Sequence, residues 1–141
     1  MLQNTIETRA LQAAVAIFGL VPLSAGLTGV LFGPEMAADG VYPVSLDSHF
    51  RYLSGLLLGI GLAFWSTIPR IAQHAARFRL LTAIVFIGGL GRLLSLIELG
   101  APSPPMLFGL VMELIVTPAL CLWQTSLLQR TTLNHGVRRV I

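Results

Sequence analysis

The chain contains no lysine and only one cysteine, and charged residues make up 11% of its 141 residues. A water-soluble domain covers its surface with charged side chains, which typically make up about 25% of its residues, so this composition excludes that class. The lone Cys121 excludes an intramolecular disulfide and a Cys-x-x-Cys redox motif. The basic residues are all arginine and form no continuous stripe, so we expect no nucleic-acid partner despite the net charge of +3.

The remaining composition is strongly apolar, with 55% hydrophobic residues. Crossing a hydrocarbon core of about 30 Å as a helix takes about 20 such residues. Four stretches meet this length, and the first three end at glycine or proline, which terminate helices. They cover residues of about 10–32, 50–68, 78–99 and 106–128. The sequence therefore predicts an all-α fold, an antiparallel bundle of four transmembrane helices in a single domain over residues 1–141.

The distribution of arginine predicts the orientation of these helices, because basic flanking segments tend to stay in the cytoplasm. Seven arginines flank the spans on one side: Arg9, Arg70, Arg77, Arg79, Arg130, Arg138 and Arg139. The other side has Glu35, Asp39 and Asp47, with Arg51 as its only flanking arginine. We therefore expect a multi-pass protein of the cell inner membrane, with both termini cytoplasmic and the lipid bilayer as its surroundings.

The only long connection is the outer loop over residues 33–49, and loops of this length are often functional. Residues 42–44 in this loop are compatible with either a short strand or an interfacial segment. Asp47 or Ser48 is a suitable N-cap for the second span.

Two charged residues lie inside the predicted spans, where a charge costs roughly 2.5 to 3.5 kcal/mol and normally faces a partner or a cavity. Arg92 lies six residues below Glu98, and Glu113 lies seven residues below Met106. At 1.5 Å per residue both lie about 10 Å beneath the outer surface. Equal depth and opposite charge predict an ion pair.

The polar segment at residues 47–52, where the second span begins, adds further candidate residues on the same outer side. Arg51 and Arg92 would hold the polar head of a ligand, and the glycine-lined helix faces would receive its apolar tail. This combination is typical of a site for an amphipathic molecule. No metal and no cofactor are expected, since His49 has no second histidine or cysteine at ligand spacing. The candidate ligand-binding residues are Asp47, His49, Arg51, Arg92, Glu98 and Glu113.

Three segments carry a resemblance to a known family: LDSHFRYLSGLLLGIGLAF at residues 46–64, GGLGRLLSL at residues 88–96, and Glu113 with Pro118. Over roughly residues 10–128 the chain resembles a bacterial family of small uncharacterised four-helix membrane proteins, which is loosely related to the DoxX-like group. The resemblance implies the fold and topology described above and no substrate. Some DoxX-like proteins are associated with sulfur and quinone redox chemistry, but this chain lacks paired cysteines.

Three functions are compatible with these patterns. The first is a binding or accessory module with an outer-facing polar pocket for a lipid-like or quinone-like molecule. The second is a structural subunit of a larger membrane complex, in which the Arg92–Glu113 pair only fixes helix register. The third is a small isomerase-like enzyme in which Glu113 or His49 transfers a proton. The sequence assigns no catalytic residue and leaves enzymatic activity undecided.

Overall fold

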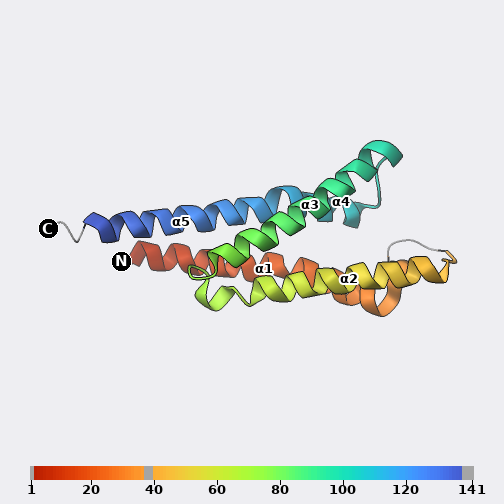
Figure 1. Cartoon of the computed structure of the whole chain (residues 1–141), viewed down its shortest axis with the longest axis horizontal. Coiled ribbons are helices and arrows are strands. Elements are labelled where there is room, and N and C mark those ends of the chain that lie inside the picture. The colour runs from red at the N-terminus through yellow and green to blue at the C-terminus, as the bar shows by residue number, and fades with distance from the viewer. Residues whose placement is uncertain (1, 37–39, 138–141) are drawn as a thin grey trace. The chain divides into compact units, whose positions relative to one another are not determined.

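The computed structural model describes the backbone of residues 2–36 and 40–137 and the side chains of residues 5–35 and 40–130. Asp39, Arg138 and Arg139, which support the predicted orientation, lie outside the described residues. Figure 1 shows the helices in chain order. They are α1 (Leu2–Phe32), the 3₁₀ turn η1 (Gly33–Met36), α2 (Val44–Trp65), the 3₁₀ turn η2 (Ile68–Arg70), α3 (Ala75–Leu99), α4 (Pro104–Val111), the π turn η3 (Met112–Val116) and α5 (Thr117–Val137).

Within the described part of the chain, four helices are long and apolar enough to cross a membrane, as the sequence predicts. The candidate spans are Thr5–Glu35, Val44–Arg70, Ala75–Leu99 and Pro104–Arg130. The described residues contain no strand, so an all-helical fold is confirmed for them. Most of the helix ends extend a few residues beyond the predicted apolar stretches, because helices continue into the polar boundary where their caps lie.

The start of α2 differs from the prediction. The helix begins at Val44, with Pro43 as its N-cap at φ −57° and ψ 141°, so neither Asp47 nor Ser48 is the cap. The Pro43 carbonyl accepts hydrogen bonds from the amides of Leu46 and Asp47 at 2.9 and 3.1 Å. Asp47 instead lies in the first turn, where a negative charge is favourable beside the positive end of the helix dipole. The predicted outer loop is therefore helical over its last six residues, 44–49.

The chain forms two compact units. The first contains Met1–Val15 and Thr67–Ile141, and the second contains Ala16–Ser66. The single domain expected from the sequence stays a prediction.

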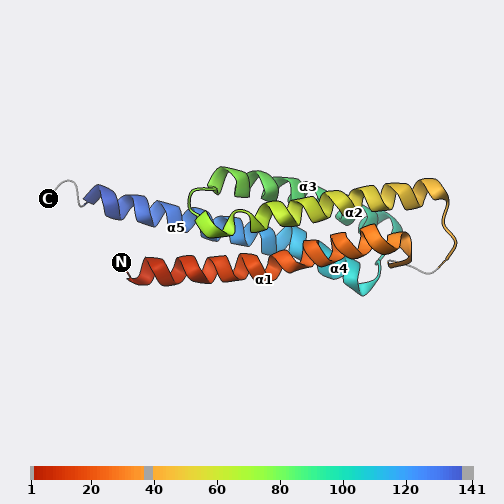
Figure 2. The same cartoon turned by 90° about the horizontal axis from the view of Figure 1, so that it is seen from below.

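The second unit is a helical hairpin in which glycines of α1 lie against side chains and backbone of α2 (Figures 1 and 2). Gly19 lies against Trp65, Gly26 against Leu58, and Gly29 against Ser54, so contacts run in opposite directions along the two helices. The Trp65 indole also donates a hydrogen bond to the Ala16 carbonyl at 3.2 Å. Small residues at these positions let two backbones approach closely, as is common between transmembrane helices.

The first unit has its most completely buried side chains around the connector between α2 and α3. Leu11, Thr67, Phe78 and Gln124 are all less than 2% exposed. Two glutamines hold the connector through its backbone. The Gln12 side-chain amide donates to the Ile68 carbonyl and the Gln124 amide to the Ile71 carbonyl, both at 2.6 Å. These bonds fix the backbone of the connector to α1 and α5.

The last span is interrupted by the π turn η3 between α4 and α5. The backbone N–H of Thr117 and its hydroxyl both donate to the Met112 carbonyl, the hydroxyl at 2.8 Å. Pro118 follows directly, and it has no N–H while its ring crowds the carbonyl four residues earlier. Proline is a common cause of such a local change in helical winding. The winding changes at the turn that contains Glu113.

Candidate functional site

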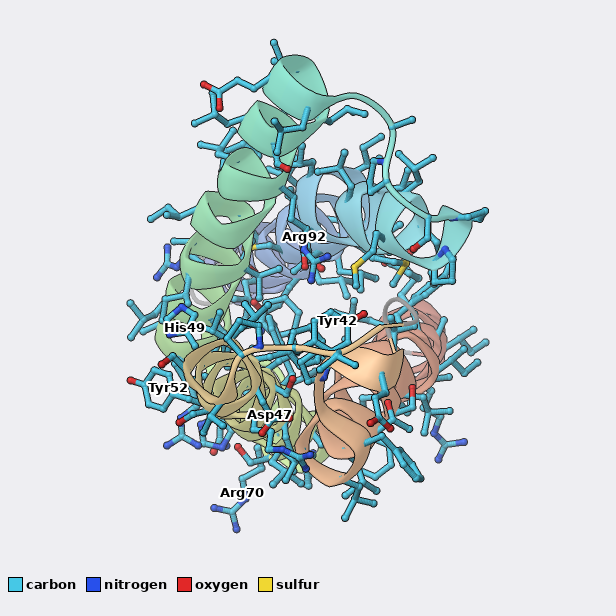
Figure 3. All side chains as sticks on the ribbon, turned by 90° about the vertical axis from the view of Figure 1, so that its right-hand side faces the viewer. Tyr42, Asp47, His49, Tyr52, Arg70 and Arg92 are labelled. Atoms are coloured by element: carbon cyan, nitrogen blue, oxygen red, sulfur yellow. The ribbon has the colours of Figure 1, made fainter. Side chains whose placement is uncertain are left out.

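Arg92 of α3 and Glu113 of η3 form the ion pair that the sequence predicts. Arg92 Nε lies 3.1 Å from Glu113 Oε2, and the two side chains are 38% and 15% exposed. Figure 3 shows Arg92 leaving α3 toward the helical segment that follows the Pro-rich turn. A charge pair therefore lies inside the apolar spans, with its carboxylate largely covered and its guanidinium partly open.

The hydrogen bonding of this pair is incomplete. Glu113 Oε2 is buried and accepts no well-directed hydrogen bond, although Arg92 Nε is within ion-pair distance. Arg92 Nη1 donates to the Met106 thioether at 3.0 Å. A thioether is a weak acceptor, whereas a guanidinium forms its strongest bonds with anionic oxygens. The site therefore has capacity for a better acceptor than the protein supplies.

Glycines of α3 and α4 determine the space around the pair. At Gly89, a Cβ would lie 2.7 Å from Leu114 Cδ2 and 3.0 Å from Glu113 Cβ, so α3 and η3 are in close contact there. At Gly109, a Cβ would lie 3.9 Å from Arg92 Nη1. At Gly88, one helical turn from Arg92 on the same face, a Cβ would meet no atom within 4 Å. The helix surface beside the guanidinium is therefore open.

Gly89→Ala is expected to destabilise the protein by about 1 to 3 kcal/mol, because the added methyl overpacks the contact with Leu114 and Glu113. Gly88→Ala is the matched control, since its methyl enters open space and alanine favours the helix. Thermal unfolding in detergent measures both variants. Equal melting temperatures for the two would contradict the close approach of η3 to α3.

Asp47 and Arg51 form a second charged pair, which lies in the hairpin unit. Arg51 Nε lies 2.9 Å from Asp47 Oδ2, and Arg51 Nη1 donates to the carbonyls of Val30 and Leu31 at 2.6 and 2.9 Å. These carbonyls are among the last four of α1, which have no partner within the helix. Arg51 therefore caps the C-terminus of α1, where a positive charge also suits the helix dipole.

Gly33 makes room for this cap. It follows α1 in the left-handed region at φ +66°, and a Cβ there would meet Asp47 Oδ1 and Arg51 Nη2. A side chain at this position would be strained and would also displace the ion pair. Asp47 and Arg51 thus stabilise the hairpin by connecting the start of α2 to the end of α1.

The other candidate residues are exposed. His49 lies on α2 and Glu98 lies one residue before the end of α3. Figure 3 shows His49 and Tyr52 on the side of α2 that faces away from α1. The structure thus joins Arg92 with Glu113 in one unit and Asp47 with Arg51 in the other. The ligand-binding role of all six residues stays a prediction.

Sequence reasoning did not identify Met106, Gln12 or Gln124 as contact residues. Thr117 followed by Pro118 was a usable signal for irregular winding near Glu113, because proline disturbs the preceding turn. The two glutamines give no such signal, since a glutamine near a helix end is ordinarily solvated.

Four membrane-length apolar helices and a charge pair within them define an all-helical, multi-pass membrane protein. A comparison with protein families matches residues 10–124, well over half of the chain, to the family described as Domain of unknown function (DUF4345). The protein belongs to this family, which confirms the resemblance to an uncharacterised family. The bacterial origin and the relation to the DoxX-like group stay predictions. No curated protein and no solved structure matches the chain.

Proposed function

We propose that this protein is a binding or accessory module of the cell inner membrane, which holds the polar head of an amphipathic, lipid-like or quinone-like molecule at Arg92 and Glu113. In this proposal the four spans form an antiparallel bundle with both termini in the cytoplasm, and the pair lies in its outer half. The observation that carries the proposal is the Arg92 guanidinium, which is partly exposed within a span and donates its Nη1 hydrogen to a thioether.

The surroundings of Arg92 fit a molecule with one polar end. An oxygen of the head group would replace the Met106 thioether as the acceptor of the Nη1 hydrogen, which gives a shorter and stronger bond. The apolar part would lie over Gly88, where the helix surface is open. Asp47, His49, Arg51 and Glu98 remain proposed rim residues.

The test is a thermal-stability titration of the purified protein with a short-chain quinone and, separately, a short-chain phosphatidylcholine, whose head group has no net charge. A ligand at one hundred times its Kd stabilises a protein by about 2.7 kcal/mol. We expect stabilisation by one of the probes, its loss in Arg92→Met and partial retention in Arg92→Lys. Arg130→Met is the matched control, because it removes the same charge from another ion pair, the one with Glu7. Full stabilisation of Arg92→Met would refute the proposal.

The second candidate is a purely structural pair within a membrane subunit, and the 3.1 Å separation of Arg92 and Glu113 favours it. This candidate predicts that Arg92→Met lowers stability while neither probe stabilises the wild-type protein. The isomerase-like alternative needs a Glu113 carboxyl free to exchange a proton, and its pairing with Arg92 gives that role no support.

A further inference from the structure

Five exposed arginines lie where the spans of the first unit end near the α2–α3 connector. The candidate spans on either side of the connector end at Arg70 and begin at Ala75, which places the connector at a boundary of the apolar region. The arginines are Arg9, Arg70, Arg77, Arg79 and Arg130. Side-chain contacts bring their segments together, since Glu7 lies 3.6 Å from Arg130 and Gln12 bonds to the Ile68 carbonyl.

Side-chain contacts fix the backbone of the connector, which carries Arg70. Thr67 and Ile71 are buried on either side of η2, and the bonds from Gln12 and Gln124 hold the carbonyls of Ile68 and Ile71. Arg70 is the last residue of η2, and Figure 3 shows its side chain pointing away from the ribbon. A fixed backbone lowers the entropy that an arginine loses when it binds an anion.

The charge of this end is strongly unbalanced. Glu7 is the only described carboxylate in these segments, and it pairs with Arg130. The described carboxylates outside them are Glu35, Asp47, Glu98 and Glu113. Several positive charges therefore share one end of the first unit with a single negative charge.

We propose that this end is a docking surface for the head groups of anionic phospholipids in the adjoining leaflet, with Arg70 and Arg79 as its main contacts. Guanidinium groups bind phosphate oxygens in pairs of parallel hydrogen bonds. Arginines close to an anionic membrane surface each contribute about fivefold to lipid preference. Their flexible stems also let Arg79, on the first turns of α3, reach the head groups from an apolar segment. This surface is independent of the site at Arg92.

The experiment reconstitutes the full chain in phosphatidylcholine vesicles and measures spin-labelled phosphatidylglycerol against spin-labelled phosphatidylcholine of the same chain length by electron paramagnetic resonance. We expect the protein to prefer phosphatidylglycerol, and Arg70→Gln/Arg79→Gln to lower the ratio of association constants by roughly fivefold for each arginine. The control Arg70→Lys/Arg79→Lys keeps the charge and is expected to keep most of the preference.

Two results would overturn the proposal: equal association of the two lipids with the wild-type protein, or an unchanged ratio in the glutamine variant. Circular dichroism and the melting temperature show whether that variant folds. If it does not, the wild-type protein is measured in roughly 1 M salt, where the Debye length falls to about 3 Å. A preference that survives this screening unchanged would also overturn the proposal.

Discussion

Gly26→Ala is expected to lower the free energy of unfolding of the protein by about 1 to 3 kcal/mol or more. Unfolding in sodium dodecyl sulfate measures this as a lower midpoint. The new Cβ would lie 2.6 Å from the Leu58 nitrogen and 2.8 Å from the Leu58 Cα. Both atoms belong to the backbone of α2 and cannot move aside by a change of rotamer. The two helices of the hairpin must therefore separate, and the neighbouring contacts lose packing along with them.

Gly59→Ala is the matched control for this prediction, because it makes the same change at the residue that follows Leu58 on α2, where a Cβ meets no atom within 4 Å. Alanine there is expected to be neutral or slightly stabilising, since it has the higher helix propensity. If both variants unfold at the same denaturant concentration, the close approach of α1 and α2 at Gly26 is wrong.

Arg92→Met and Glu113→Leu are each expected to destabilise the protein by about 2 to 3 kcal/mol, because each leaves the other charge unpaired inside a span. The double variant is expected to return to within about 1 kcal/mol of the wild type, since no charge then remains. Unfolding of all four proteins gives the coupling energy of the pair.

The pair of Arg130 and Glu7 provides the comparison. Its atoms are 3.6 Å apart and its side chains are 66% and 39% exposed, so the corresponding cycle is expected to give no more than about 1 kcal/mol. Additive effects of Arg92→Met and Glu113→Leu would show that the two side chains do not interact in the membrane.

The features that the sequence predicted correctly depend on the membrane environment and on the depth of a residue within it. A hydrocarbon core demands long apolar helices, so the four spans follow from composition. The pairing of Arg92 with Glu113 follows from depth, because two opposite charges at one level inside an apolar layer have few other partners.

The features that it missed depend on contacts between distant segments. Asp47 fits an N-cap by residue type, but Pro43 supplies extended dihedral angles and starts α2 earlier. Arg51 was predicted as a ligand-binding residue, and its contact with the carbonyls of Val30 and Leu31, some twenty residues away in the chain, was not predicted. Nothing in the local pattern around Arg51 identifies those two carbonyls, because every residue of α1 carries one.

The π turn at Met112–Val116 has a consequence for insertions and deletions. A π turn contains about one residue more than an α turn, so removing one residue from it restores regular winding and rotates the two ends of the span by about 100° relative to each other. Glu113, which pairs with Arg92, lies at the start of that turn, and Gln124, which donates to the Ile71 carbonyl, lies beyond its end. The two polar contacts therefore depend on the number of residues between Glu113 and Gln124 as much as on the identity of these residues.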